Sequence, residues 1–122
     1  SECERFFQEY SHALLIRVST NADKDNYPSD WSRQTTKALL ALERDVFISG
    51  HHKAFLLNQT CCCTCKSCPG NRLDCTDKRN SRPSPEAFAV DVYQLVRQAN
   101  MEVNVISQNK SLINRYAILM VE

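Results

Sequence analysis

Six of the seven cysteines of this 122-residue chain lie within one short stretch, between Thr60 and Cys75. Cys62, Cys65 and Cys68 form a C-x-x-C-x-x-C run, and Cys75 follows after six further residues. Three thiolates at this spacing can surround one side of a compact inorganic cluster, and a fourth can close the site. Runs of this kind are a common source of ligands for [4Fe–4S] clusters. The spacing therefore favours these four cysteines as ligands of one such cluster.

Zinc is the main alternative to an iron–sulfur cluster in this loop. A Cys₄ zinc site usually takes its ligands from two separated C-x-x-C pairs, whereas this chain offers one triple and one single cysteine. Disulfides fit the pattern less well, because adjacent cysteines do not easily meet the geometry of a bridge with one another. The sequence thus favours an iron–sulfur cluster first, zinc second, and disulfides or unbound thiols last.

Five further residues lie close to the expected ligands in the sequence. Cys61 and Cys63 are interpreted as small side chains packed under the loop, and roles as alternative ligands or as thiols for a second metal stay open. Arg82 has two equally weighted interpretations: it donates hydrogen bonds to cluster sulfurs or loop carbonyls and so tunes the site, or it pins the loop to the domain. His51 and His52 would be neighbours of a metal site, although the pattern favours a polar turn there.

Apolar runs and turn residues predict the elements that must position the loop. Residues 10–20 and 53–58 are predicted as strands, with a helix over residues 31–48 between them. Gly50 is expected to end that helix, because glycine tolerates a positive φ. The cysteine loop, residues 60–76, follows the second strand directly.

The second half of the chain predicts one more helix and two more strands. Ser84 is a natural N-cap and Pro85 suits the first helical position, so a helix is expected from there to residue 99. Residues 102–107 and 114–122 are predicted as strands. The whole chain, residues 1–122, is then a single α+β or α/β domain, with one layer of two helices on a mixed four-stranded sheet. A right-handed crossover would make the first two strands parallel.

Composition excludes several classes of function. The formal net charge is +1, which gives no support for a nucleic-acid partner, because phosphate binding needs a clear basic excess or patch. No apolar run approaches the roughly 18 residues of a transmembrane helix, so membrane insertion is not expected. With two glycines in the chain, a phosphate-cradling loop is not expected either. No catalytic constellation is visible, and the chain is not expected to be an enzyme by itself.

The cysteine set and its flanking segments resemble a family of predicted metal-binding proteins of unknown function. Members share an LER-x-x-F helix, a glycine before the next strand, C-x-x-C-x-x-C, a further cysteine, RPS-x-EA and DV. In this chain these are Leu42, Glu43, Arg44 and Phe47, Gly50, the four cysteines above, Arg82, Pro83, Ser84, Glu86 and Ala87, and Asp91 and Val92. The resemblance covers nearly the whole chain and implies metal binding, but no reaction.

The chain departs from the pattern of that family in two places. Members commonly carry a cysteine-rich segment, ending in Cys-Pro-Pro, ahead of the first strand, and the sequence given does not include it. The resemblance therefore implies either that such a segment is missing here or that one site serves where others have two. The first cysteine of the family follows Gly-Pro, whereas Cys62 follows Thr60 and Cys61. The ligand register among Cys61, Cys62 and Cys63 therefore stays open.

Together these patterns predict a cytoplasmic domain that holds one metal centre. Clustered thiols favour a reducing compartment, and a [4Fe–4S] cluster would serve electron transfer or an accessory redox role. Such a role implies a protein redox partner or a larger complex. Two other functions stay open: a structural zinc module for protein–protein interaction, and delivery of a metal or a cluster.

Overall fold

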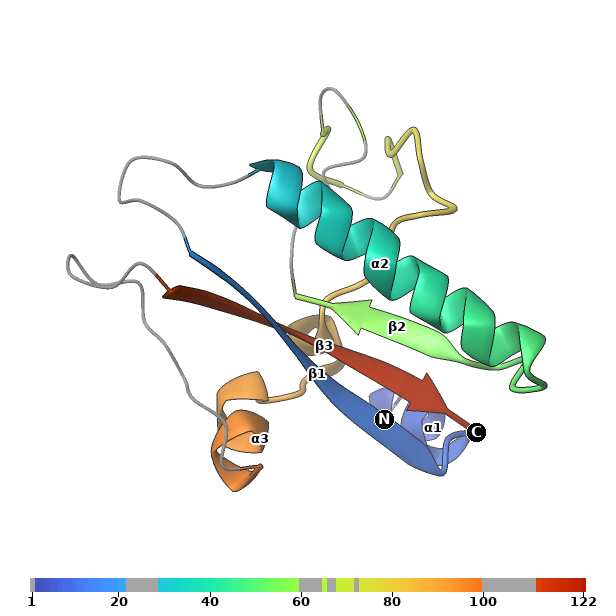
Figure 1. The fold of residues 1–122 in the computed structure, drawn as a ribbon. Helices are drawn as coiled ribbons and strands as arrows, with labels where there is room; N and C mark the ends of the chain where they lie inside the picture. Colours follow the sequence, from blue (N-terminus) through green and yellow to red (C-terminus); the bar gives the residue numbers. More distant parts are fainter. Residues whose placement is uncertain (1, 22–28, 60–64, 66–67, 72, 100–111) are drawn as a thin grey trace.

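A computed structural model describes residues 2–21, 29–59, 65, 68–71, 73–99 and 112–122 (Figure 1). Three α-helices, one 3₁₀ helix and three strands lie within these residues. Their order is α1 (Glu2–Gln8), β1 (His12–Asn21), α2 (Ser29–Ile48), β2 (Phe55–Asn58), η1 (Pro85–Phe88), α3 (Val92–Gln98) and β3 (Leu112–Val121). The α+β class predicted from the sequence is confirmed.

The three strands form an antiparallel sheet in which β3 occupies the centre. The strand order is β1-β3-β2, and β3 pairs antiparallel with both neighbours, as in Leu14 opposite Leu119 and Leu56 opposite Leu119. Because β1 and β2 both run against β3, they run parallel to each other, but they are not adjacent. Within the described residues the sheet is antiparallel and not mixed, because the last strand lies between the first two. The predicted strand at 102–107 lies outside the described residues.

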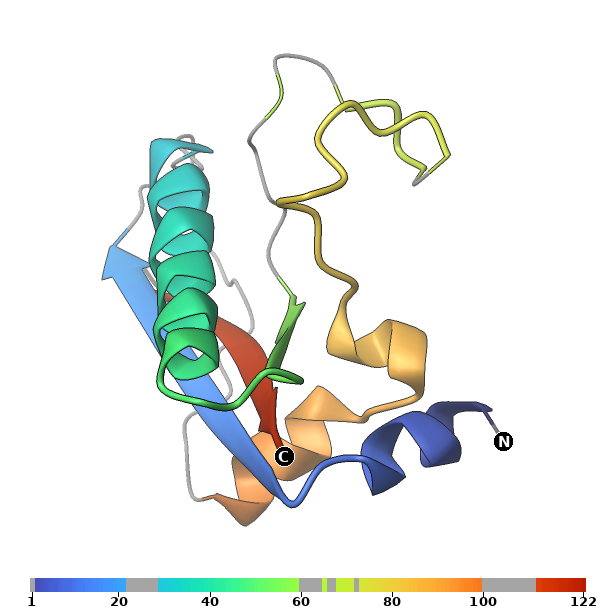
Figure 2. The ribbon, with the colours of Figure 1, turned by 90° about the vertical axis from the view of Figure 1, so that its right-hand side faces the viewer.

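Alternation along the strands sends side chains to two opposite faces of the sheet. On one face, Leu56 and Leu119, both 0% exposed, pack with Leu39 of α2. On the other face, Leu57, Ile118 and the neighbouring Met120 of β3 pack against aromatic residues of α1 and η1 and against α3. Figure 2 shows α2 on one side of the sheet and the smaller helices on the other. The predicted single layer of helices is therefore wrong, because helices cover both faces.

The helix predicted after Ser84 is interrupted. Ser84 does cap a helix start, since its Oγ accepts from the Ala87 amide at 3.3 Å, but η1 ends after one turn. Ala89 adopts a left-handed conformation, with φ of 61°, and Asp91 then caps α3 by accepting from the Gln94 amide at 3.1 Å. Ala89 thus redirects the chain between two short helices.

The long helix α2 matches its prediction closely, and it is the element that faces the cysteine loop. It begins at Ser29 and ends at Ile48, and Gly50 follows with φ of 119°. A positive φ is costly for any residue with a Cβ, so Gly50 ends the helix as expected. The short helix α1 was not predicted. No described helix is long and apolar enough to cross a membrane.

Candidate metal-binding loop and its anchors

Three of the four predicted ligands lie within the described residues. Cys65, Cys68 and Cys75 are thiols rather than members of disulfides; Cys68 is exposed, and Cys65 and Cys75 are partly buried. Cys62, together with the alternative ligands Cys61 and Cys63, lies outside the described residues. The accessible thiols are consistent with a loop whose sulfur atoms can reach a metal from solvent.

Short-range hydrogen bonds fold the second half of the loop into turns. Gly70 has a positive φ of 78°. Next, the Asn71 side chain accepts from the Asp74 amide at 2.9 Å and donates to the Asp74 carboxylate at 2.9 Å. Cys65 Sγ lies 3.4 Å from Thr76 Oγ1. That contact places Cys65 beside the residue that follows Cys75.

The donor set fits a thiolate-ligated metal, although the described thiols do not form a group of three ligands. Among the described residues, no three His, Cys, Asp or Glu side chains lie in a group that could hold a metal ion. Four cysteines supply the sulfur ligands that both an iron–sulfur cluster and a Cys₄ zinc site require. Thiolate chemistry therefore suits both an iron–sulfur cluster and a zinc ion at the predicted ligands Cys62, Cys65, Cys68 and Cys75.

The two ends of the loop are joined at the edge of the sheet. The amide of Asn58, the last residue of β2, donates to the Pro83 carbonyl at 2.9 Å. Gln59 continues the attachment, because its amide donates to the Tyr116 carbonyl at 3.2 Å and its side chain donates to Glu86 at 2.8 Å. The two ends of the cysteine segment are therefore held together, and this closure reduces the conformational entropy that the segment would lose on binding a metal.

Arg82 locks the end of the loop to α2 and β2. Its guanidinium donates to both carboxylate oxygens of Glu43, at 3.0 and 2.6 Å, and to the carbonyls of Arg79 and Ser81, at 2.7 and 3.1 Å. Glu43 also accepts from the Leu56 amide at 2.7 Å. The hydrogen bonds to Glu43 raise the pKa of Arg82, outweighing the opposite effect of its burial. These contacts are those of a residue that pins the loop to the domain.

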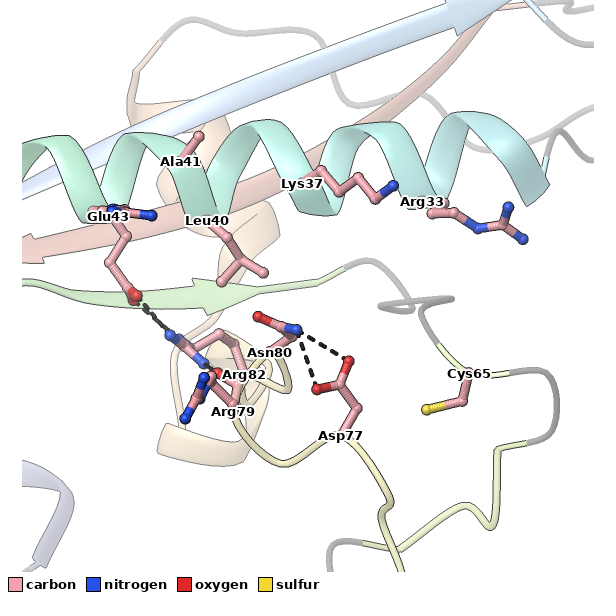
Figure 3. A pocket seen from close by; sticks show the side chains of 11 residues that line it. Arg33, Lys37, Leu40, Ala41, Glu43, Cys65, Asp77, Arg79, Asn80 and Arg82 are labelled. Atoms are coloured by element: carbon pink, nitrogen blue, oxygen red, sulfur yellow. Dashed lines mark hydrogen bonds and ion pairs between the residues drawn. The ribbon is translucent and has the colours of Figure 1, made fainter.

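The two histidines lie away from the described thiols. His51 and His52 follow the C-terminal end of α2, where His51 Nδ1 lies 3.8 Å from Glu122 and the His52 ring packs on Phe47. Cys65, in contrast, lines a pocket whose α2 residues run from Arg33 to Arg44, and Figure 3 shows it toward the Arg33 end of the helix. Since α2 has 20 residues and a helix rises about 1.5 Å per residue, most of its length separates the histidines from Cys65.

A pocket between α2 and the loop contains residues that the sequence analysis did not single out. Its volume is about 900 Å³, and Figure 3 shows Arg33 and Lys37 of α2 facing Cys65 and Asp77 of the loop. Asp77 accepts from the Asn80 side chain at 3.1 Å. The α2 residues of this wall recur at helical spacing. They are Arg33, Lys37, Leu40, Ala41, Glu43 and Arg44. The spacing of the cations among them can be read from the sequence, but it does not by itself indicate a pocket, because the opposite wall comes from the loop.

Comparison with known proteins agrees with the cysteine chemistry. A family model described as "Predicted metal-binding protein (DUF2284)" matches residues 1–121. No curated protein and no solved structure matches the chain significantly. The family match covers all the predicted ligands and both of their anchoring elements.

Proposed function

The chain belongs to this family of predicted metal-binding proteins, and from that premise we propose that its cysteine loop holds a [4Fe–4S] cluster. Cys62, Cys65, Cys68 and Cys75 would be the four thiolate ligands. The supporting observation is the set of accessible thiols at Cys65, Cys68 and Cys75, carried on one loop that is closed at its base. A cluster bound there would supply one-electron chemistry.

The protein would then act in electron transfer or in an accessory redox role in the cytoplasm. A reducing compartment keeps thiols available as ligands. Cys68 is exposed, so a ligand at this position would bring the centre close to the protein surface. We therefore propose a protein redox partner or a larger complex that receives or supplies the electron. Arg82 and Glu43 would hold the loop in position for this contact.

Metal analysis of anaerobically purified protein tests the proposal. We expect about four irons and four acid-labile sulfides per chain, with broad absorption near roughly 400 nm. Cys65→Ser, Cys68→Ser and Cys75→Ser should each lower the iron and sulfide content strongly. Cys3→Ser is the matched control, because Cys3 lies on α1, on the face of the sheet opposite α2, and it should leave both contents unchanged.

The same analysis separates the proposed cluster from its alternative. One zinc per chain without sulfide would contradict the electron-transfer role and would make the loop a structural module for protein–protein interaction. Release of iron and sulfide to an acceptor protein on mixing would instead indicate delivery of the cluster. Equal metal loss in Cys3→Ser and in the loop variants would contradict the proposed ligand set.

A further inference from the structure

The pocket between α2 and the cysteine loop concentrates positive charge in a chain that is nearly neutral. Five of its eleven lining residues are Lys or Arg and two are acidic, although the formal net charge of the whole chain is +1. One third of all 15 Lys and Arg residues therefore line this one pocket. Its volume of about 900 Å³ lies within the range of small-molecule sites.

The two acidic residues of the pocket offset only part of the charge of its five cations. Glu43 is held by Arg82 at 2.6 Å, and Asp77 accepts two hydrogen bonds from Asn80 at 3.1 Å. Neither Lys37 nor Arg79 forms an ion pair with an acidic side chain in the described part of the chain. The two lie on opposite walls, one on α2 and the other on the loop (Figure 3).

We propose that this pocket binds a small dianion, a phosphate ester or a dicarboxylate, between α2 and the cysteine loop. Arginine presents paired N–H donors that match carboxylate and phosphate oxygens, and lysine adds a point charge. Lys37 and Arg79 would contact the anionic groups from opposite sides. Leu40 and Ala41, which also line the pocket, offer apolar surface to a short carbon chain. The ligand class rests on the described side chains alone.

The position of Cys65 links this site to the proposed metal centre. Cys65 lines the same pocket as Lys37 and Arg79, so a bound dianion would lie beside a metal ligand. This second step rests on the proposed function, whereas the anion site does not. The proposed metal centre would then have a small anionic molecule as its neighbour in addition to a protein partner.

Titration of the full chain as purified, with inorganic phosphate and with succinate at constant ionic strength, tests the inference. We expect one of the two anions to bind, and Lys37→Gln or Arg79→Gln to raise its Kd by about 3-fold each and about tenfold together. The matched control is Arg17→Gln combined with Lys53→Gln, which removes the same charge from exposed sites outside the pocket. This pair should change Kd by less than about 2-fold.

Each outcome decides the proposal. Phosphate binding alone identifies a phosphate ester, and succinate binding alone identifies a dicarboxylate. Absence of binding at millimolar concentration, or equal weakening by the pocket and control pairs, overturns the inference. Binding that appears only after metal removal also overturns it, because the cations would then serve the thiolate centre. Metal content is measured on the same samples, so that the cluster proposal and the anion-site proposal are tested separately. Protein without metal would contradict the proposed cluster, and the anion titration on that protein would still test the pocket.

Discussion

Tyr10 shows how one side chain joins segments that are distant in sequence. Its hydroxyl donates to the Lys53 carbonyl at 2.7 Å, which ties the chain after α1 to the turn before β2. Its ring packs on Phe6, with 5.2 Å between the centroids. Burial, and then the negative charges of Glu9, Glu122 and Glu43, raise the pKa of Tyr10. Ionisation would remove the only proton that the hydroxyl can donate.

Tyr10→Phe should therefore destabilise the protein in a pH-dependent way. The substitution keeps the ring and removes the hydrogen bond, so we expect a loss of about 1 kcal/mol in the free energy of unfolding near neutral pH. Because the folded-state pKa is raised, this stabilisation is fully present below the unfolded-state pKa of about 10. It is lost as the pH rises through the folded-state value.

Urea unfolding of wild type and Tyr10→Phe at about pH 8 and about pH 11, with a reductant present, measures this effect. The difference between the two proteins should shrink at the higher pH. Tyr93→Phe is the control, since Tyr93 is 54% exposed on α3, and it should change little at either pH. A difference for Tyr10→Phe that stays constant with pH would contradict the role given to its hydroxyl.

At the scale of elements, Glu43 connects α2, β2 and the end of the cysteine loop. It accepts from Arg82 and from the Leu56 amide. The Arg82 and Glu43 side chains are 19% and 13% exposed, so water screens this pair less than it screens a surface pair. Removing one charge leaves the other poorly compensated in a partly buried position.

A double-mutant cycle on Glu43→Gln and Arg82→Gln isolates this pair. Each single variant should lose about 2 kcal/mol in the free energy of unfolding, and the pair should show a coupling of about 1 kcal/mol or more. Glutamine at position 43 keeps an oxygen acceptor for the Leu56 amide, so the cycle reports mainly on the charge.

The matched cycle uses Asp30→Asn and Arg33→Gln on the same helix. Their side chains lie 3.8 Å apart and are 84% and 51% exposed, and we expect a coupling below about 0.5 kcal/mol. Equal couplings in the two cycles would mean that burial does not strengthen the Glu43–Arg82 pair. Chemical-denaturant unfolding of metal-free protein measures both.

The elements that the sequence predicted well are those with long, regular patterns. The apolar residues of α2 recur at helical spacing, and its end is marked by Gly50, whose φ is 119°. The apolar run in β3 likewise identified a strand, which lies at the centre of the described sheet, with Leu119 0% exposed. A helix that buries one stripe shows apolar residues at helical spacing, and a strand that is buried on both faces shows a continuous apolar run. Both patterns can be recognised in the sequence.

The features that the sequence did not reveal leave no regular pattern in one segment of the chain. The apolar pattern from Phe88 to Leu95 reads as one helix, but Ala89 takes a positive φ and divides it. Alanine gives no local signal for that conformation. The pocket beside Cys65 was missed because its walls come from α2 and the loop, which meet only in the folded chain. The cysteine spacing, in contrast, is local and could be read directly.

For the whole molecule, the position of α2 leaves one side of its sheet face less covered than the other. Leu119 of β3 is 0% exposed beneath α2, whereas Leu14, its register partner on the edge strand β1, is 50% exposed. The two leucines are opposite each other on the same face. The core on this face therefore lies over β2 and β3, the half of the sheet that also anchors the cysteine loop through Asn58 and Glu43.

Leu119→Ala and Leu14→Ala should consequently differ widely in their cost. We expect Leu119→Ala to lower the free energy of unfolding by about 2–5 kcal/mol, because it opens a cavity in the core, and Leu14→Ala to lower it by about 1 kcal/mol or less. Urea unfolding measures both. Similar costs would show that Leu14 is covered in solution, and a cost that falls with dilution would identify the cover as a second copy of the chain. The expected contrast would instead establish that the β2–β3 half carries the stability on which the loop depends.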